Sequence, residues 1–250
     1  MRLVRARYRG EEAYGILEGE EIRVLQGLPY EGLAFTGQLW PRSAVRLVAP
    51  CQPSKIIALG LNYRDHAREL HMPLPEEPLI FLKPPSSIIG PEETIVRPPQ
   101  SKRVDYEAEL AVVIGKKGKN IAAEEALDYV LGYTCFNDVT ARDLQQKDGQ
   151  WTRAKGFDTF APVGPWIETD LDPNNVRVEA YLNGKCRQSS STQELVFSVP
   201  QIISFVSQIM TLMPGDVIAT GTPPGIGPLA SGDVIEIKIQ GIGVLKNTVI

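Results

Sequence analysis

The sequence predicts a mixed α/β fold that is rich in β-strands. Short apolar or alternating segments recur along the chain, and glycine, proline and other turn-forming residues separate them. In residues 233–240, Ile235, Ile237 and Ile239 alternate with polar side chains, which gives one buried face and one solvated face. Few segments carry helical signals, so the expected strands outnumber the expected helices.

Composition narrows the class of protein. The chain has 250 residues, 43% hydrophobic and 22% charged, enough for one large domain or two unequal ones. A net charge of −4 with interspersed signs argues against nucleic acid as the main partner. Three cysteines without a C-x-x-C spacing predict neither a zinc knuckle nor a disulfide framework, which fits a reducing, cytoplasmic compartment. No signal peptide or membrane-spanning segment is expected, because no apolar run is long enough.

Two domains are expected, with a boundary near Pro50. Residues 1–50 form a small N-terminal β domain, with strands at 2–8, 13–17 and 22–25 followed by a looser stretch, 28–41. Residues 51–250 form the larger, catalytic domain. Its expected strands cover residues 55–60, 79–83, 104–115, 133–138, 216–221 and 233–240.

Helices are expected in three places in the larger domain. Residues 62–70 form a short helix with Asn62 as its N-cap, and residues 122–132 form a second. The strongest signal lies at 198–212, where Ser198 and Gln201 have the spacing of a capping box and Pro200 lies in the first turn.

Two glutamates on one strand suggest a metal site. Glu107 and Glu109 are two residues apart, so on a strand they point to the same face, and the apolar residues that follow predict burial. Two buried carboxylates need a cation between them, and their hard oxygens suit Mg²⁺, Mn²⁺ or Ca²⁺. Asp138, at a strand end, can supply a third ligand, and Asp105 is a further acid nearby. Spacing alone equally allows the solvated face of an edge strand.

Other residues could carry chemistry. His66 and Glu69 share a helix face, so the carboxylate can orient the imidazole as a general base, although a solvated polar pair has the same spacing. His71 is expected to be exposed. The loop containing Gly221 and Thr222 offers backbone N–H groups and a hydroxyl to a carboxylate, or is a plain turn. It lacks the G-K-[ST] of a nucleotide-binding loop.

Seven segments together resemble the fumarylacetoacetate hydrolase family. In order, they are GLNYRDHAREL, PLIFLKPPSSIIGP, VDYEAELAVVIG, GYTCFNDVTARDLQ, WTRAKGFDTFAPVGPW, NGKCRQSSST and MPGDVIATGTPPGIGP, spanning roughly residues 55–245. The resemblance implies the family's β-roll and a homodimer. It also implies a divalent ion held by Glu107, Glu109 and Asp138, and a lid on which His66 and Glu69 activate water. Residues 1–50 resemble the small N-terminal domain of some members only loosely.

The resemblance also assigns single residues. Lys155 matches the family's active-site lysine, which would stabilise an enolate oxygen, whereas most lysines lie on the surface. Gln145 matches a position that binds substrate or water, as Thr222 and Gly221 would. Lys83 and Arg64 are weaker candidates for binding a substrate carboxylate.

The function implied is metal-dependent chemistry on small 2-oxo or enol carboxylic acids through an enolate. C–C hydrolysis or decarboxylation of the acylpyruvate or oxaloacetate type is the leading expectation. The alternative is a 2-hydroxyhepta-2,4-diene-1,7-dioate isomerase or 5-oxopent-3-ene-1,2,5-tricarboxylate decarboxylase of aromatic catabolism. A second alternative is a metal-binding scaffold without catalysis.

Overall fold

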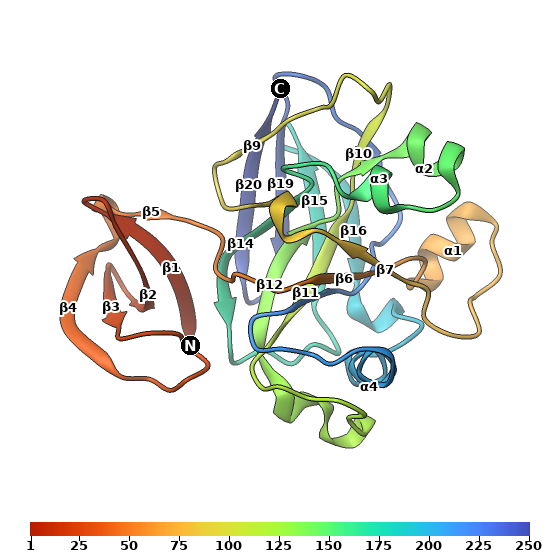
Figure 1. The fold of residues 1–250 in the computed structure, drawn as a ribbon. Coiled ribbons are helices and arrows are strands. Elements are labelled where there is room, and N and C mark those ends of the chain that lie inside the picture. The colour runs from red at the N-terminus through yellow and green to blue at the C-terminus, as the bar shows by residue number, and fades with distance from the viewer.

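A large, mostly antiparallel sheet organises the molecule. The computed structural model describes all residues, 1–250, and Figure 1 shows its arrangement. Twelve strands belong to this sheet, along the path β4-β3-β2-β1-β14-β12-β11-β17-β6-β7, with β5 paired to β1 and β8 to β14. Their bounds are β1 (Arg2–Tyr8), β2 (Glu11–Glu18), β3 (Glu21–Leu25), β4 (Phe35–Pro41), β5 (Arg46–Leu47), β6 (Ile56–Leu59), β7 (Ile80–Lys83), β8 (Ile88–Ile89), β11 (Ala108–Ile114), β12 (Val130–Asn137), β14 (Ala161–Glu168) and β17 (Val217–Ala219).

Two smaller sheets complete the β-structure. A five-stranded sheet has the order β16-β15-β19-β20-β9, and a three-stranded sheet has the order β13-β10-β18. Their bounds are β9 (Thr94–Ile95), β10 (Val104–Tyr106), β13 (Thr140–Ala141), β15 (Arg177–Leu182), β16 (Lys185–Ser191), β18 (Gly227–Pro228), β19 (Val234–Ile239) and β20 (Gly243–Val249). The β-rich mixed fold expected from the sequence is therefore confirmed.

The helices are short and few. The α-helices are α1 (Arg64–Leu70), α2 (Arg142–Asp148), α3 (Thr152–Lys155) and α4 (Val199–Ile209). The 3₁₀ helices are η1 (Arg42–Ala44), η2 (Pro85–Ser87), η3 (Ala123–Tyr129) and η4 (Thr192–Glu194). In Figure 1, α1, α2 and α3 gather on the side of the molecule away from β1–β4. No helix has the length and apolar character needed to cross a membrane.

The strand β11 lies at the centre of the hydrophobic core. It pairs with β12 on one side and β17 on the other, and all seven of its residues are buried. Leu110 and Val112 pack into the largest core cluster, which includes the alternating isoleucines of β19, whereas Ala111 and Val113 pack into a second cluster on the other face. Burial on both faces explains why residues 110–114 are continuously apolar.

The N-terminal strands have a core of their own and also join the main sheet. Val4, Ile22 and Trp40 belong to a small cluster formed mainly by these strands. At its beginning β1 pairs with β14, where Leu3 lies opposite Ile167.

Four expectations about local structure were wrong. Residues 104–115 are not one strand, because pairing breaks at Glu107 between β10 and β11. Residues 123–129 form 3₁₀ rather than α-helix. The stretch 28–41 contains β4, which pairs with β3. Tyr63, not Asn62, is the N-cap of α1, because the Asn62 side chain instead bonds to the backbone of Phe197 and Thr220.

Candidate active site

The candidate site begins at the strand break around Glu107. The Glu107 N–H donates to Asn137 Oδ1 at 2.9 Å, and the Asp138 N–H donates to the Glu107 carbonyl oxygen, also at 2.9 Å. Because β11 and β12 are antiparallel neighbours, with Ala108 opposite Asn137, the end of β12 lies directly beside the break. These bonds hold Asp138 next to Glu107 through the backbone.

Three carboxylates converge at this point. Glu107, Glu109 and Asp138 are all buried, and each offers an oxygen such that the three atoms lie within 4.8 Å of one another. The solvated edge-strand alternative for the two glutamates is wrong, since β11 is a central strand with a fully buried surface.

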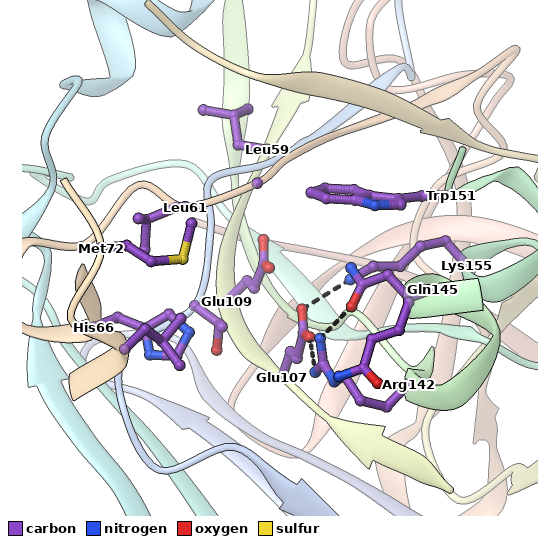
Figure 2. A pocket seen from close by; sticks show the side chains of 14 residues that line it. Leu59, Leu61, His66, Met72, Glu107, Glu109, Arg142, Gln145, Trp151 and Lys155 are labelled. Carbon is purple, nitrogen blue, oxygen red and sulfur yellow. Dashed lines mark hydrogen bonds and ion pairs between the residues drawn. The ribbon is translucent and has the colours of Figure 1, made fainter. Parts of the chain in front are cut away.

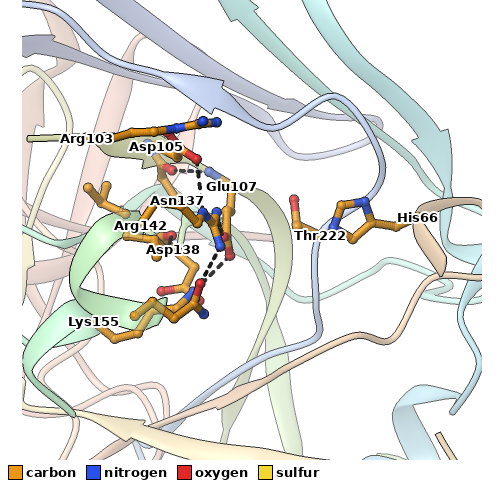
Figure 3. A network of polar contacts seen from close by, with 12 residues as sticks. His66, Arg103, Asp105, Glu107, Asn137, Asp138, Arg142, Lys155 and Thr222 are labelled. Carbon is orange, nitrogen blue, oxygen red and sulfur yellow. Dashed lines mark hydrogen bonds and ion pairs between the residues drawn. The ribbon is translucent and has the colours of Figure 1, made fainter. Parts of the chain in front are cut away.

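Lysine and arginine side chains neutralise the negative charges of two of these carboxylates, Glu107 and Asp138. Lys155 Nζ donates to Glu107 Oε2 at 2.9 Å and to Asp138 Oδ2 at 2.5 Å. Arg142 Nη2 pairs with Glu107 Oε1, and the buried Lys83 pairs with Asp138 Oδ1. Glu107 and Asp138 thus share three cations before any metal is considered, whereas Glu109 has none. Figure 3 shows Arg142 and Lys155 beside Glu107 and Asp138.

The two glutamates ionise very differently. Burial disfavours the charged form of Glu107, but the adjacent Lys155 and Arg142 outweigh it and hold its pKa at about 2. For Glu109, burial and the nearby Asp138 and Glu107 charges raise the pKa well above its usual value. Glu109 is therefore the carboxylate with the greatest need of an added cation.

The donor set fits a hard divalent ion. Glu109 Oε2 accepts the Gly221 N–H at 2.7 Å, while Glu109 Oε1 is buried without any partner. The other oxygens are paired, but a carboxylate oxygen has more than one lone pair and can meet both an ammonium and a metal. Glu107, Glu109 and Asp138 could together hold Mg²⁺, Mn²⁺ or Ca²⁺, and oxygen ligands alone do not select among them.

A cavity of about 320 Å³ opens beside two of these carboxylates, Glu107 and Glu109 (Figure 2). Its apolar lining residues are Leu59, Leu61, Leu70, Met72 and Trp151. Its other lining residues are Gly60, His66, Glu107, Glu109, Arg142, Gln145, Gln146, Lys155 and Thr222. Asp138 pairs with Lys155 but is not among the lining residues.

Helix α1 brings His66 to the cavity. The helix ends at His71, which adopts a left-handed conformation with φ of 53° and is exposed, and Pro73 follows. His66 is 6% exposed, and its Nδ1 lies 2.8 Å from Glu69 Oε2. The Gly225 N–H also donates to the Glu69 carboxylate, at 3.1 Å to Oε1. Glu69 therefore holds the imidazole by one nitrogen and leaves Nε2 without a partner.

The segment 221–225, called here the 221–225 loop, contacts several of these groups. Gly221 has a φ of 98°, and a Cβ there would lie 2.9 Å from Asn62 Cβ, so glycine is required. Thr222 Oγ1 donates to the Ala108 carbonyl at 2.9 Å and accepts from Gln188 Nε2 at 2.8 Å. The hydroxyl expected to bind substrate is thus already engaged, whereas the Thr222 N–H has no partner in the chain.

Helices α2 and α3 form the opposite wall. Gln145 on α2 accepts from Arg142 Nη1 at 2.7 Å, and Lys155 is the last residue of α3. Trp151, just before α3, packs edge-on against Phe81 with ring centroids 5.2 Å apart.

The structure groups most of the candidate residues and separates a few. His66, Glu69, Glu107, Glu109, Asp138, Gln145, Lys155, Gly221 and Thr222 all lie in or next to this cavity. Lys83 contacts Asp138 rather than the cavity, and Arg64 donates to the Leu195 carbonyl. Arg142 and Trp151 were missed by the sequence analysis, although both belong to segments that carry the family resemblance.

Comparisons with known proteins show the family of this chain. The fumarylacetoacetate (FAA) hydrolase C-terminal family profile matches residues 55–250, and an Rv2993c-like N-terminal profile matches residues 1–50. The structure of 5-carboxymethyl-2-hydroxymuconate delta-isomerase from Mycobacterium smegmatis superposes with a TM-score of 0.95 at 46% identity, covering 100% of this chain and 99% of that one.

Two further relatives differ in their named reactions. Rat mitochondrial oxaloacetate tautomerase Fahd2a is 46% identical over 230 residues, covering 87% of this chain and 74% of the relative. Maleylpyruvate hydrolase from Sphingobium sp. SYK-6, solved with manganese(II) and pyruvate, has a TM-score of 0.81 at 33% identity and covers 100% of this chain and 99% of that one. The chain belongs to the fumarylacetoacetate hydrolase family.

Proposed function

We propose that the chain is a divalent-metal-dependent enzyme that cleaves or decarboxylates small 2-oxo carboxylic acids through an enolate. The observation that carries this proposal is the buried cluster of Glu107, Glu109 and Asp138, of which the two glutamates line one cavity together with Lys155 and His66. The manganese and pyruvate named for the Sphingobium maleylpyruvate hydrolase structure support it.

Each residue has a role that follows from its position. Glu107, Glu109 and Asp138 would hold Mg²⁺ or Mn²⁺, and the bound ion would supply Lewis-acid chemistry for a 2-oxo acid. Lys155 stays protonated, since burial opposes its charge but the Asp138 and Glu107 carboxylates outweigh burial and raise its pKa. Its ammonium stabilises the negative charge that develops on the substrate oxygen. Gln145 and the Thr222 N–H bind the substrate carboxylate or water.

His66 is the proposed general base. Glu69 accepts a hydrogen bond from the Nδ1–H of His66, so Nε2 is free to act on the substrate. Nε2 could take a proton from the water that attacks the distal carbonyl, or return a proton to the enolate carbon. Asymmetry between the two ring nitrogens is what a carboxylate partner imposes on an imidazole.

The cavity lining argues against a substrate with a second carboxylate far from the first. Its only cationic lining residues are Arg142 and Lys155, and both already pair with acids. The rest of the lining includes five apolar side chains, the two glutamates and the uncharged Gln145 and Gln146, so a second, distant carboxylate would be desolvated without a cationic partner. This supports the acylpyruvate type over a long dicarboxylate.

The alternative is isomerisation or decarboxylation of the catabolic dicarboxylates, which the name of the Mycobacterium smegmatis isomerase favours. We expect metal-dependent cleavage of acetylpyruvate or loss of CO₂ from oxaloacetate, each abolished by EDTA. Turnover of 2-hydroxyhepta-2,4-diene-1,7-dioate alone, seen as an ultraviolet shift without cleavage, would establish the alternative. Metal binding without turnover of any of these acids would contradict both.

The His66→Ala variant is expected to lose turnover and to retain binding. Removal of a general base typically costs about 10²–10⁴-fold in rate, and we expect kcat for acetylpyruvate cleavage to fall by that amount. Mn²⁺ affinity should change little, since His66 is not among the proposed ligands. His71→Ala, at the exposed end of the same helix, is the matched control and should match the unmodified protein. Equal kcat in both variants would remove His66 from the mechanism.

A further inference from the structure

Three backbone N–H groups of the 221–225 loop differ in what they bind. The Gly221 N–H holds Glu109, a proposed metal ligand, and the Gly225 N–H holds Glu69, which orients His66. Between them, the Thr222 N–H has no partner in the chain, and Thr222 lines the cavity. This one loop therefore contacts a proposed metal ligand, the partner of the proposed general base, and the cavity.

A single buried side chain beneath the loop, that of Gln188 on β16, has every polar atom engaged. Gln188 is 0% exposed, and its Oε1 accepts the Ala108 N–H at 2.9 Å. Its Nε2 donates to Thr222 Oγ1 at 2.8 Å and to the Pro223 carbonyl at 2.7 Å. Ala108 lies between Glu107 and Glu109, so the amide bridges the loop and the strand of the proposed ligands.

The neighbouring residue on β16, Arg187, lies close to the other end of the loop. Gly225 has a φ of 97°, and a Cβ there would lie 2.1 Å from the Arg187 carbonyl oxygen. The Tyr106 hydroxyl also donates to the Gly225 carbonyl at 3.0 Å. Thr222, Pro223 and Gly225 thus all lie against two consecutive residues of β16.

We propose that Gln188 is a positioning residue for substrate binding, which fixes the Thr222 N–H relative to Glu107 and Glu109. The inference rests on the proposed function, because it takes the occupant of the cavity to be a 2-oxo acid. Gln188 lies outside the cavity lining and acts through Thr222. A buried polar network with all members satisfied specifies one geometry, and removing the central amide leaves the Ala108 N–H and the Pro223 carbonyl unpaired.

The test is pyruvate binding to the Mn²⁺-loaded protein, measured by calorimetry, in Gln188→Met. We expect the Kd for pyruvate to rise by about tenfold or more, the effect of losing a well-placed hydrogen bond, while the Kd for Mn²⁺ changes by less than about twofold. Asn247→Leu is the matched control. Asn247 is also a buried amide, and its Nδ2 donates to the Gly90 and Glu93 carbonyls away from the cavity. It should lower the unfolding temperature but leave pyruvate binding unchanged.

Two substitutions at Thr222 test the same contact without disturbing β16. Thr222→Val removes the hydroxyl and should weaken pyruvate binding as Gln188→Met does, whereas Thr222→Ser should restore it. The double variant of Gln188→Met and Thr222→Val should bind pyruvate no more weakly than the single variant with the lower pyruvate affinity. Unchanged pyruvate affinity in Gln188→Met and Thr222→Val would overturn the inference alone. Failure of the unmodified protein to bind pyruvate would overturn the proposed function and this inference with it.

Discussion

The Glu109→Gln variant is expected to lose at least about 100-fold in affinity for Mn²⁺ and all metal-dependent turnover; outer contacts alone are worth up to about that factor. Among the oxygens of the three carboxylates, only Glu109 Oε1 is buried without a hydrogen-bond partner. The glutamine amide carries no charge, and its NH₂ group would present a donor where the ion needs an acceptor. Glu107→Gln should likewise abolish metal-dependent turnover.

Calorimetric titration with Mn²⁺ measures this effect without an enzyme assay. Glu179→Gln is the matched control, because Glu179 is also buried but lies on β15, beside Lys238. We expect that control to bind Mn²⁺ as the unmodified protein does. If Glu109→Gln bound Mn²⁺ with unchanged affinity, the carboxylate cluster would not be the metal site.

The Lys155→Met variant is expected to separate metal binding from catalysis. The Lys155 ammonium contacts two of the proposed ligands, so its loss removes repulsion of the incoming cation, and Mn²⁺ affinity should stay the same or increase. Turnover should nevertheless fall by about 10²–10³-fold, because the charge developing on the substrate loses a preorganised donor.

In the absence of metal, the Lys155→Met variant should have a lower free energy of unfolding than the unmodified protein. Glu107 and Asp138 would lose a buried partner, a change that typically costs about 3–5 kcal/mol, and added Mn²⁺ should restore part of the unfolding temperature by linkage. Lys55→Met is the control, since Lys55 pairs with the buried Asp216 instead. A loss of Mn²⁺ affinity in Lys155→Met would instead make Lys155 a structural support of the ligands.

The pattern of apolar and polar residues predicted those strands well that bury either one face or both faces. The alternation in β19 and the continuous apolar run of β11 follow from which faces each strand buries. The capping box of α4 was also correct, since Ser198 and Gln201 act locally and need no tertiary partner. The segments predicted wrongly depend on distant contacts. Asn62 could cap α1 by its position, yet Phe197 and Thr220 take its side chain.

In the candidate site, too, some features could be predicted from the sequence and others depend on distant contacts. The sequence by itself determined the family, the β-rich fold and the residue types that could serve as ligands, lysine and histidine, because these depend on identity and order along the chain. Only the tertiary structure decided that β11 breaks at Glu107, that Arg142 and Lys83 compensate the carboxylates, and that Gln188 bridges Ala108 and Thr222. Those contacts join residues that are 34 to 80 positions apart. Sequence spacing carries no information about such pairs until the strands and loops have packed together.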